Sequence, residues 1–195
     1  MLKERDYNIL KFLEYSHAIS IEQCGNIFFN GSYEGARRRL KQLEEIYGRI
    51  KSFKLKETGE KIYYYDRKIT YHDKIVIDFI SEIKRKGGNI EEFKFKPQYM
   101  NNTIIPDLKC IFSYSGRVYF TLLEVDLYHN TLLSKMQRYE ELYKSNDFID
   151  GFYGQKPIFI ICKVNNNGLR YNSKNFHVLY TDKMYNGIFS FLESL

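Results

Sequence analysis

The chain has 195 residues, a formal net charge of +6 and 44% hydrophobic residues. This composition excludes a largely disordered chain, and the length allows one large domain or two small ones. No apolar run reaches the roughly 18 residues that span a bilayer, and the sequence opens on charged residues rather than on an apolar signal region. The three cysteines and four histidines are scattered and match neither a disulfide framework nor a zinc-ligand spacing. We therefore expect a cytoplasmic protein with no membrane partner and no cofactor held by cysteine or histidine.

Positive charge is concentrated in one stretch, residues 35–56, which carries eight lysines and arginines against two glutamates. Outside this stretch the basic and acidic residues nearly cancel. A concentrated cationic surface favours nucleic acid as the partner, because each neutralised phosphate releases condensed counterions. The first part of the chain is therefore the expected binding region.

Four elements follow one another in this first part. Apolar residues at helical spacing predict a first helix over residues 4–15. Ser20 and Gln23 have the spacing of a capping box, which predicts the start of a short second helix. A third helix is predicted over residues 33–47, and two extended stretches around a polar turn predict a hairpin over residues 50–65. This order of elements predicts a winged helix-turn-helix that binds double-stranded DNA.

The predicted third helix has two different faces. The apolar stripe that should pack against the other helices consists of Ala36, Leu40, Leu43 and Tyr47. At about 100° per residue, Arg37, Arg38 and Lys41 lie together on the opposite face, where we expect them to enter the major groove. Arg39 lies nearer the stripe, and we expect it to pack its stem or to pair internally. The hairpin residues expected to contact the DNA backbone are Arg49, Lys51, Lys54 and Lys56.

The pattern changes near residue 69, which separates the expected DNA-binding domain, residues 1–68, from a second domain, residues 69–195. The second domain opens with a helical stripe from Ile75 to Ile83. The further elements are strands over 92–96, 105–114 and 118–126, a helix over 130–144, strands over 157–162 and 177–180, and a helix over 186–195. These elements predict a mixed α/β domain, so the whole chain belongs to the α+β or α/β class.

The strand predicted over residues 118–126 places Glu124 and Asp126 on one face, because alternate residues of a strand point the same way. Both faces of this strand are largely apolar, so we expect it to be central, where an unpaired carboxylate is costly. Asp107 on the neighbouring strand would bring a third carboxylate, an arrangement that a divalent cation favours. Alternatively Lys135, on the following helix, pairs with these carboxylates in a structural ion pair.

Together these motifs resemble the replication-relaxation family of plasmids and other mobile elements. The resemblance covers nearly the whole chain and rests on Ala36-Arg37-Arg38-Arg39-Leu40, Pro106-Asp107, Leu123-Glu124-Val125-Asp126, Lys135, Tyr139 and Leu169-Arg170. The second domain also resembles the PD-(D/E)xK nuclease fold. In that resemblance Asp107 and Glu124 match the two acids, and Asp126 stands where the family has its lysine.

For an active nuclease, the resemblance implies magnesium held by Asp107, Glu124 and Asp126. Lys135, on the helix, would then supply the ammonium group that orients the attacking water or helps to deprotonate it. An aspartate cannot do the work of the family's lysine. The departure at Asp126 therefore favours a degenerate domain that binds DNA, a partner or its own copy.

The preferred hypothesis is a sequence-directed DNA-binding accessory or regulatory protein of a plasmid or other mobile element. It would act in replication or conjugative transfer, and the resemblance suggests an origin as its site. The alternatives are a magnesium-dependent DNA endonuclease and a transcriptional repressor whose second domain dimerises. The expected partners are double-stranded DNA, a replication initiator or relaxase, and a second copy of the chain, since helix-turn-helix proteins commonly read paired half-sites.

Overall fold

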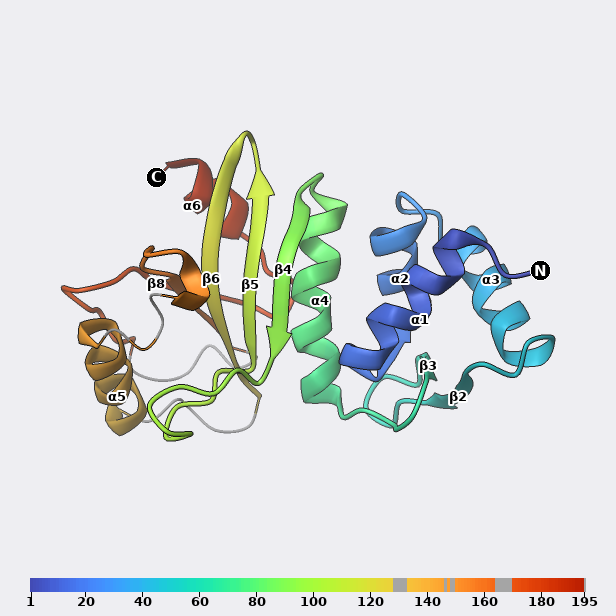
Figure 1. Cartoon of the computed structure of the whole chain (residues 1–195), viewed down its shortest axis with the longest axis horizontal. Helices are drawn as coiled ribbons and strands as arrows, with labels where there is room; N and C mark the ends of the chain where they lie inside the picture. Colours follow the sequence, from blue (N-terminus) through green and yellow to red (C-terminus); the bar gives the residue numbers. More distant parts are fainter. Residues whose placement is uncertain (128–132, 146, 148–149, 164–169, 195) are drawn as a thin grey trace. The chain divides into compact units, whose positions relative to one another are not determined.

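The computed structural model describes residues 1–127, 133–145, 147, 150–163 and 170–194. Within these ranges, six α-helices and two β-sheets form a mixed α+β structure. The chain divides into two compact units, Met1–Gly87 and Gly88–Leu195 (Figure 1). The expected boundary at residues 68/69 differs from this division, because helix α4 (Tyr71–Arg85) belongs to the first unit.

The first unit combines four helices with a small antiparallel sheet. Before α4, its elements are α1 (Glu4–Ser16), β1 (Ala18–Ser20), α2 (Ile21–Phe28), α3 (Tyr33–Glu45), β2 (Lys51–Lys54) and β3 (Lys61–Tyr64). The expected hairpin is present as β2 and β3, which pair from Lys51↔Tyr64 to Lys54↔Lys61. Strand β1 was not expected; it pairs with β3 and gives the sheet the order β1-β3-β2. Strand β1, which lies between α1 and α2, therefore connects these helices to the sheet.

Local hydrogen bonds explain where α2 and α3 begin. The predicted capping box is confirmed, since Ser20 Oγ accepts from the Gln23 amide at 3.1 Å and the Ser20 amide donates to Gln23 Oε1 at 2.8 Å. Ser32 caps α3 in a similar way, with its Oγ accepting from the Gly35 amide at 3.2 Å. The predicted stripe of α3 is confirmed for Ala36, Leu40 and Leu43, which are fully buried, whereas Tyr47 lies beyond the end of α3 and is only partly buried.

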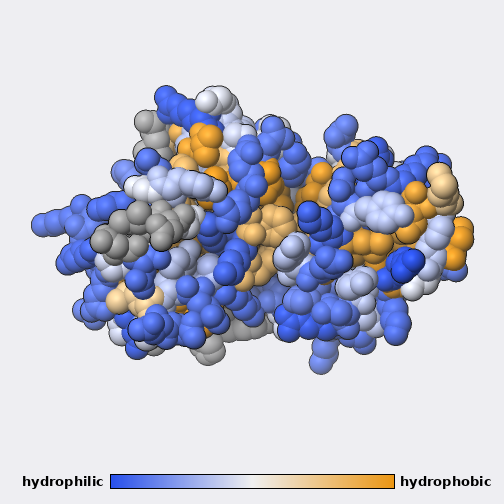
Figure 2. Space-filling view, in the orientation of Figure 1, coloured by the Kyte–Doolittle hydropathy of each residue, from blue (hydrophilic) through white to orange (hydrophobic). Residues whose placement is uncertain are grey.

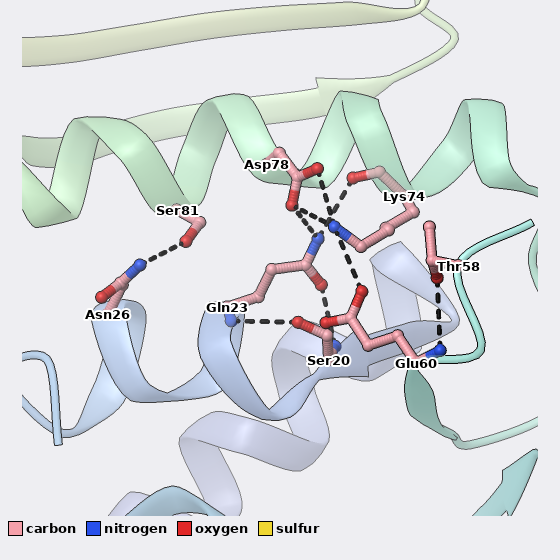
Figure 3. Close-up of polar contacts among 8 residues, drawn as sticks. All are labelled: Ser20, Gln23, Asn26, Thr58, Glu60, Lys74, Asp78 and Ser81. Atoms are coloured by element: carbon pink, nitrogen blue, oxygen red, sulfur yellow. Dashed lines mark hydrogen bonds and ion pairs between the residues drawn. The ribbon is translucent and has the colours of Figure 1, made fainter. Parts of the chain in front are cut away.

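A polar layer joins α2 to α4 (Figure 3). Gln23 Nε2 donates to the Lys74 carbonyl oxygen at 3.1 Å and to Asp78 Oδ1 at 2.7 Å. One turn further along both helices, Asn26 Nδ2 donates to Ser81 Oγ at 3.0 Å. Because these bonds are made between the two helices and away from most solvent, they fix α4 on α2. This packing explains why α4 groups with the first unit although it was expected to open the second.

The second unit is a five-stranded sheet with helices. Its elements are β4 (Asn89–Phe95), β5 (Leu108–Tyr114), β6 (Arg117–Asp126), α5 (Leu133–Lys144), the 3₁₀ helix η1 (Asp150–Phe152), β7 (Ile158–Lys163), β8 (Val178–Thr181) and α6 (Ile188–Ser194). The strand order is β4-β5-β6-β7-β8; β4, β5 and β6 are antiparallel, and β6, β7 and β8 are parallel. Residues 130–132 of the expected helix, and Leu169, lie outside the described residues.

Strand β6 is central, as predicted, and both of its faces are covered. On one face Tyr139 of α5 packs on Phe159 of β7, with ring centroids 4.2 Å apart. On the other face the Tyr119 hydroxyl donates to the Leu192 carbonyl oxygen of α6 at 3.0 Å. Residues 121–125 of β6 are consequently all buried, and any charge among them has to be compensated by a neighbouring side chain.

The surface is mainly hydrophilic on the face drawn in Figure 2. Large exposed hydrophobic side chains come from separate parts of the chain, for example Ile46, Val118 and Met184. Scattered apolar side chains of this kind are ordinary on a folded protein. No helix among the described residues combines the length and the apolar character that crossing a membrane requires.

Candidate nucleic-acid interface and acidic cluster

The exposed face of α3 carries the three basic residues expected there. Arg38 is exposed and makes no side-chain hydrogen bond or ion pair within the described residues. Arg37 lies 2.8 Å from Glu34 and Lys41 lies 3.7 Å from Glu45, and all four of these side chains are more than half exposed. Exposed ion pairs of this kind contribute little to stability. A phosphate group can therefore replace either glutamate as the partner.

The second basic surface is the hairpin, residues 49–64, which we call the basic hairpin. Arg49, Lys51, Lys54 and Lys56 are all exposed. In the ranges that the structure describes, none of these four side chains forms an ion pair. These four side chains are therefore available to bind an anionic partner.

Contacts of Glu44 join α3 to the basic hairpin. Its carboxylate accepts from Ser52 Oγ at 2.5 Å and from Lys61 Nζ at 3.0 Å. Burial disfavours the ionised form of Glu44, but these two hydrogen bonds outweigh burial and lower the pKa of the carboxyl group. A charged Glu44 thus keeps the hairpin beside the exposed face of α3.

The hairpin is also fixed to α4, a contact that sequence reasoning missed. Lys74 Nζ lies 3.0 Å from Asp78 Oδ2 and 3.4 Å from Glu60 Oε2, at the turn between β2 and β3 (Figure 3). The i,i+4 spacing of Lys74 and Asp78 could have been found in the sequence, but nothing local connects either residue to Glu60.

Arg39 has a structural role, as expected. Its Nε donates to Asp6 Oδ1 of α1 at 2.6 Å, and its guanidinium lies over the Tyr47 ring, 5.3 Å from the centroid. Asp6 is 1% exposed, and although burial opposes its ionisation, the hydrogen bond from Arg39 lowers the pKa of the carboxyl group. Arg39 therefore holds α1 against α3 and is turned away from the basic face.

The second unit contains a buried acidic cluster around Glu124, which is 3% exposed. Lys135 Nζ lies 2.7 Å from Glu124 Oε1, so the ion pair that was the alternative to a metal site is present, and the Tyr139 hydroxyl donates to the same oxygen. Asp107 lies close by, with Oδ2 accepting from the Val125 amide at 2.9 Å. Burial and the charge of Asp107 raise the pKa of Glu124 to about 7, against the opposing effects of Lys135 and Tyr139.

Asp126 lies further along the same strand, partly exposed and in register with Lys163 of β7. Among the residues that the structure describes, no three histidines, cysteines, aspartates or glutamates form a group that could hold a metal ion. Asp107, Glu124 and Asp126 are thus brought to one end of β5 and β6 without forming such a ligand set. The cation that the structure places beside Glu124 is the ammonium group of Lys135.

Comparison of this chain with protein families, with curated proteins and with solved structures finds no match. The resemblance to the replication-relaxation family rests on the quoted motifs alone. Function has to be inferred from the charges and geometry of the two units.

Proposed function

We propose that the first unit is a winged helix-turn-helix that binds double-stranded DNA. In this arrangement α3 enters the major groove and the basic hairpin lies along the neighbouring backbone. The supporting observation is a set of exposed basic side chains, without ion pairs among the described residues, on two elements that Glu44 holds together. These side chains are Arg38, Arg49, Lys51, Lys54 and Lys56.

We further propose that the protein is an accessory or regulatory factor of a plasmid or other mobile element, acting at a replication or transfer origin. This role follows from the family resemblance. The second unit, with its resemblance to the PD-(D/E)xK fold, would then bind a replication initiator, a relaxase or a second copy of the chain. A footprint over promoters instead of origins would favour the transcriptional repressor.

A magnesium-dependent endonuclease is the second candidate. The observation that favours it is the Lys135 ammonium at 2.7 Å from Glu124. In that chemistry an ammonium group beside an acid orients the attacking water or helps to deprotonate it. Magnesium-dependent cleavage of duplex DNA that disappears in Glu124→Ala would support the candidate. If the wild-type chain leaves the DNA uncut, the endonuclease is excluded and DNA binding remains as the proposed function.

The proposed binding function is tested by gel shift of the full chain on fragments of its own genetic element, at two salt concentrations. We expect a discrete complex on one fragment that weakens as salt rises, because phosphate contacts release counterions. Arg37→Ala/Arg38→Ala should weaken this complex by about tenfold or more, since a good base contact contributes about 1–3 kcal/mol.

The matched control is Arg85→Ala/Lys86→Ala, which removes two exposed positive charges from the end of α4. This variant should bind nearly as the wild type does. Equal weakening of both variants would show that net charge, rather than the face of α3, determines affinity, and absence of any complex would refute the proposal.

A further inference from the structure

A hollow lies beside the basic face of α3, on the side opposite the hairpin. It has a volume of about 790 Å³ and is formed by the start of α1, the loop after α2 and the first turns of α3. Four cationic side chains line it, namely Lys3, Arg5, Arg38 and Arg39, the last of which pairs with Asp6. Lys3 and Arg5 are distant from Arg38 along the chain, so Arg38 was expected to contact DNA and these two residues were not.

Among the described residues, three of the four cationic side chains of the hollow form no ion pair. The Arg5 guanidinium lies over the Phe29 ring, 4.5 Å from the centroid. Two of the acids that line the hollow are neutralised by other arginines, Asp6 by Arg39 and Glu34 by Arg37. Within the described residues, Lys3, Arg5 and Arg38 take part in no ion pair; the exposed Glu4 is the remaining acid of the lining. The hollow therefore has an excess of cationic groups that can bind an anion.

The position of the hollow follows from the contacts of α3. Arg39 contacts Asp6 of α1, whereas Glu44 contacts the hairpin, so these two residues flank the buried stripe on opposite sides. At about 100° per residue, the basic face of α3 lies between them. The hollow and the basic hairpin are thus on the two flanks of this face.

A helix in the major groove has sugar-phosphate backbone on both sides, because the groove is about 12 Å wide and a helix with its side chains about 10–12 Å. If the basic hairpin follows one backbone, the other backbone passes along the flank formed by the hollow. We propose that Lys3 and Arg5, together with Arg38, bind the DNA phosphates across the major groove from those contacted by the hairpin. This inference rests on the proposed DNA-binding function.

The test compares the full wild-type chain with Lys3→Ala/Arg5→Ala by hydroxyl-radical footprinting on the bound duplex and by the salt dependence of affinity. The variant should lose protection on one edge of the major groove and keep it on the hairpin edge. The slope of log affinity against log salt should become shallower by about 1.8, because each lost phosphate contact contributes about 0.9.

Arg85→Ala/Lys86→Ala is the charge-matched control, and Lys3→Arg/Arg5→Lys should restore both the footprint and the slope. Equal footprints of the wild type and the alanine variant, or equal losses on both edges, would overturn this inference while leaving DNA binding in place. A wild-type chain that binds no duplex would refute the proposed function and this inference with it. Melting followed by circular dichroism identifies any variant that fails to fold.

Discussion

Replacing Glu124 by glutamine tests the acidic cluster of the second unit. The folded carboxyl group has a pKa of about 7, against an ordinary value of 4.5, and burial is the main cause. At about 1.4 kcal/mol for each pKa unit, this gap corresponds to about 3 kcal/mol. Because the folded state binds the proton more tightly, the free energy of unfolding falls as pH rises from about 4.5 to about 7. Glutamine keeps the shape and the acceptor oxygen but has no carboxyl group to ionise.

The assay is chemical denaturation followed by circular dichroism between about pH 4 and about pH 8, the range that contains this titration. The free energy of unfolding of Glu124→Gln, taken relative to that of the wild type, should rise by about 3 kcal/mol from the low-pH end to the high-pH end of this range. The exposed residue Glu141, on the same helix as Lys135, provides the control Glu141→Gln, which should run parallel to the wild type.

A stability difference between Glu124→Gln and the wild type that stays constant with pH would refute this reasoning. Such a result would mean that Lys135, at 2.7 Å, keeps Glu124 ionised in the folded state throughout the range. A difference that grows toward low pH would reverse the sign of the argument and exclude burial as the dominant influence on the carboxyl group.

Two further predictions concern the first unit. Lys74→Met leaves the partly buried Asp78 without its ammonium partner and should lower the free energy of unfolding by about 2 kcal/mol, between the values for exposed and buried pairs. Denaturation of the single variant and of Lys74→Met/Asp78→Asn measures this, and the double variant should recover stability; no recovery would contradict the pairing. Arg39→Ala leaves buried Asp6 uncompensated and should cost about 3 kcal/mol near neutral pH, with the cost shrinking in acid as Asp6 protonates. A cost that does not change with pH would show that lost packing, rather than charge, explains the effect.

Much of the first unit could be predicted because its signals are local. The capping box of Ser20 and the apolar stripe of α3 depend on residues three or four positions apart, and the structure has both. Strand β1 has three residues between two helices and is too short to show a period. The place of α4 depends on Gln23 bonding to Asp78, residues 55 positions apart, which no local pattern reveals.

The parts of the candidate sites that depend on residues close together in the sequence could be predicted, and the parts that depend on the packing of distant segments could not. Lys135 could be assigned to Glu124 because the apolar stripe of α5 fixes which side of that helix meets the sheet. Which carboxylates gather around Glu124 depends on strand register and on the covering helix, so the sequence left the ion pair and the metal site as alternatives. Lys3 and Arg5 were missed because they join Arg38 through the packing of α1 on α3.

The salt dependence of duplex DNA binding by the full chain tests the central claim most directly. Five exposed basic side chains on α3 and the hairpin, each binding one phosphate, would contribute about −4.5 to the slope of log affinity against log salt, and phosphate contacts of Lys3 and Arg5 would add about −1.8. Lys51→Ala/Lys54→Ala/Lys56→Ala should reduce the steepness of that slope by about 2.7. No duplex binding, or a slope that the three substitutions leave unchanged, would contradict the claim that the first unit binds DNA through α3 and the basic hairpin.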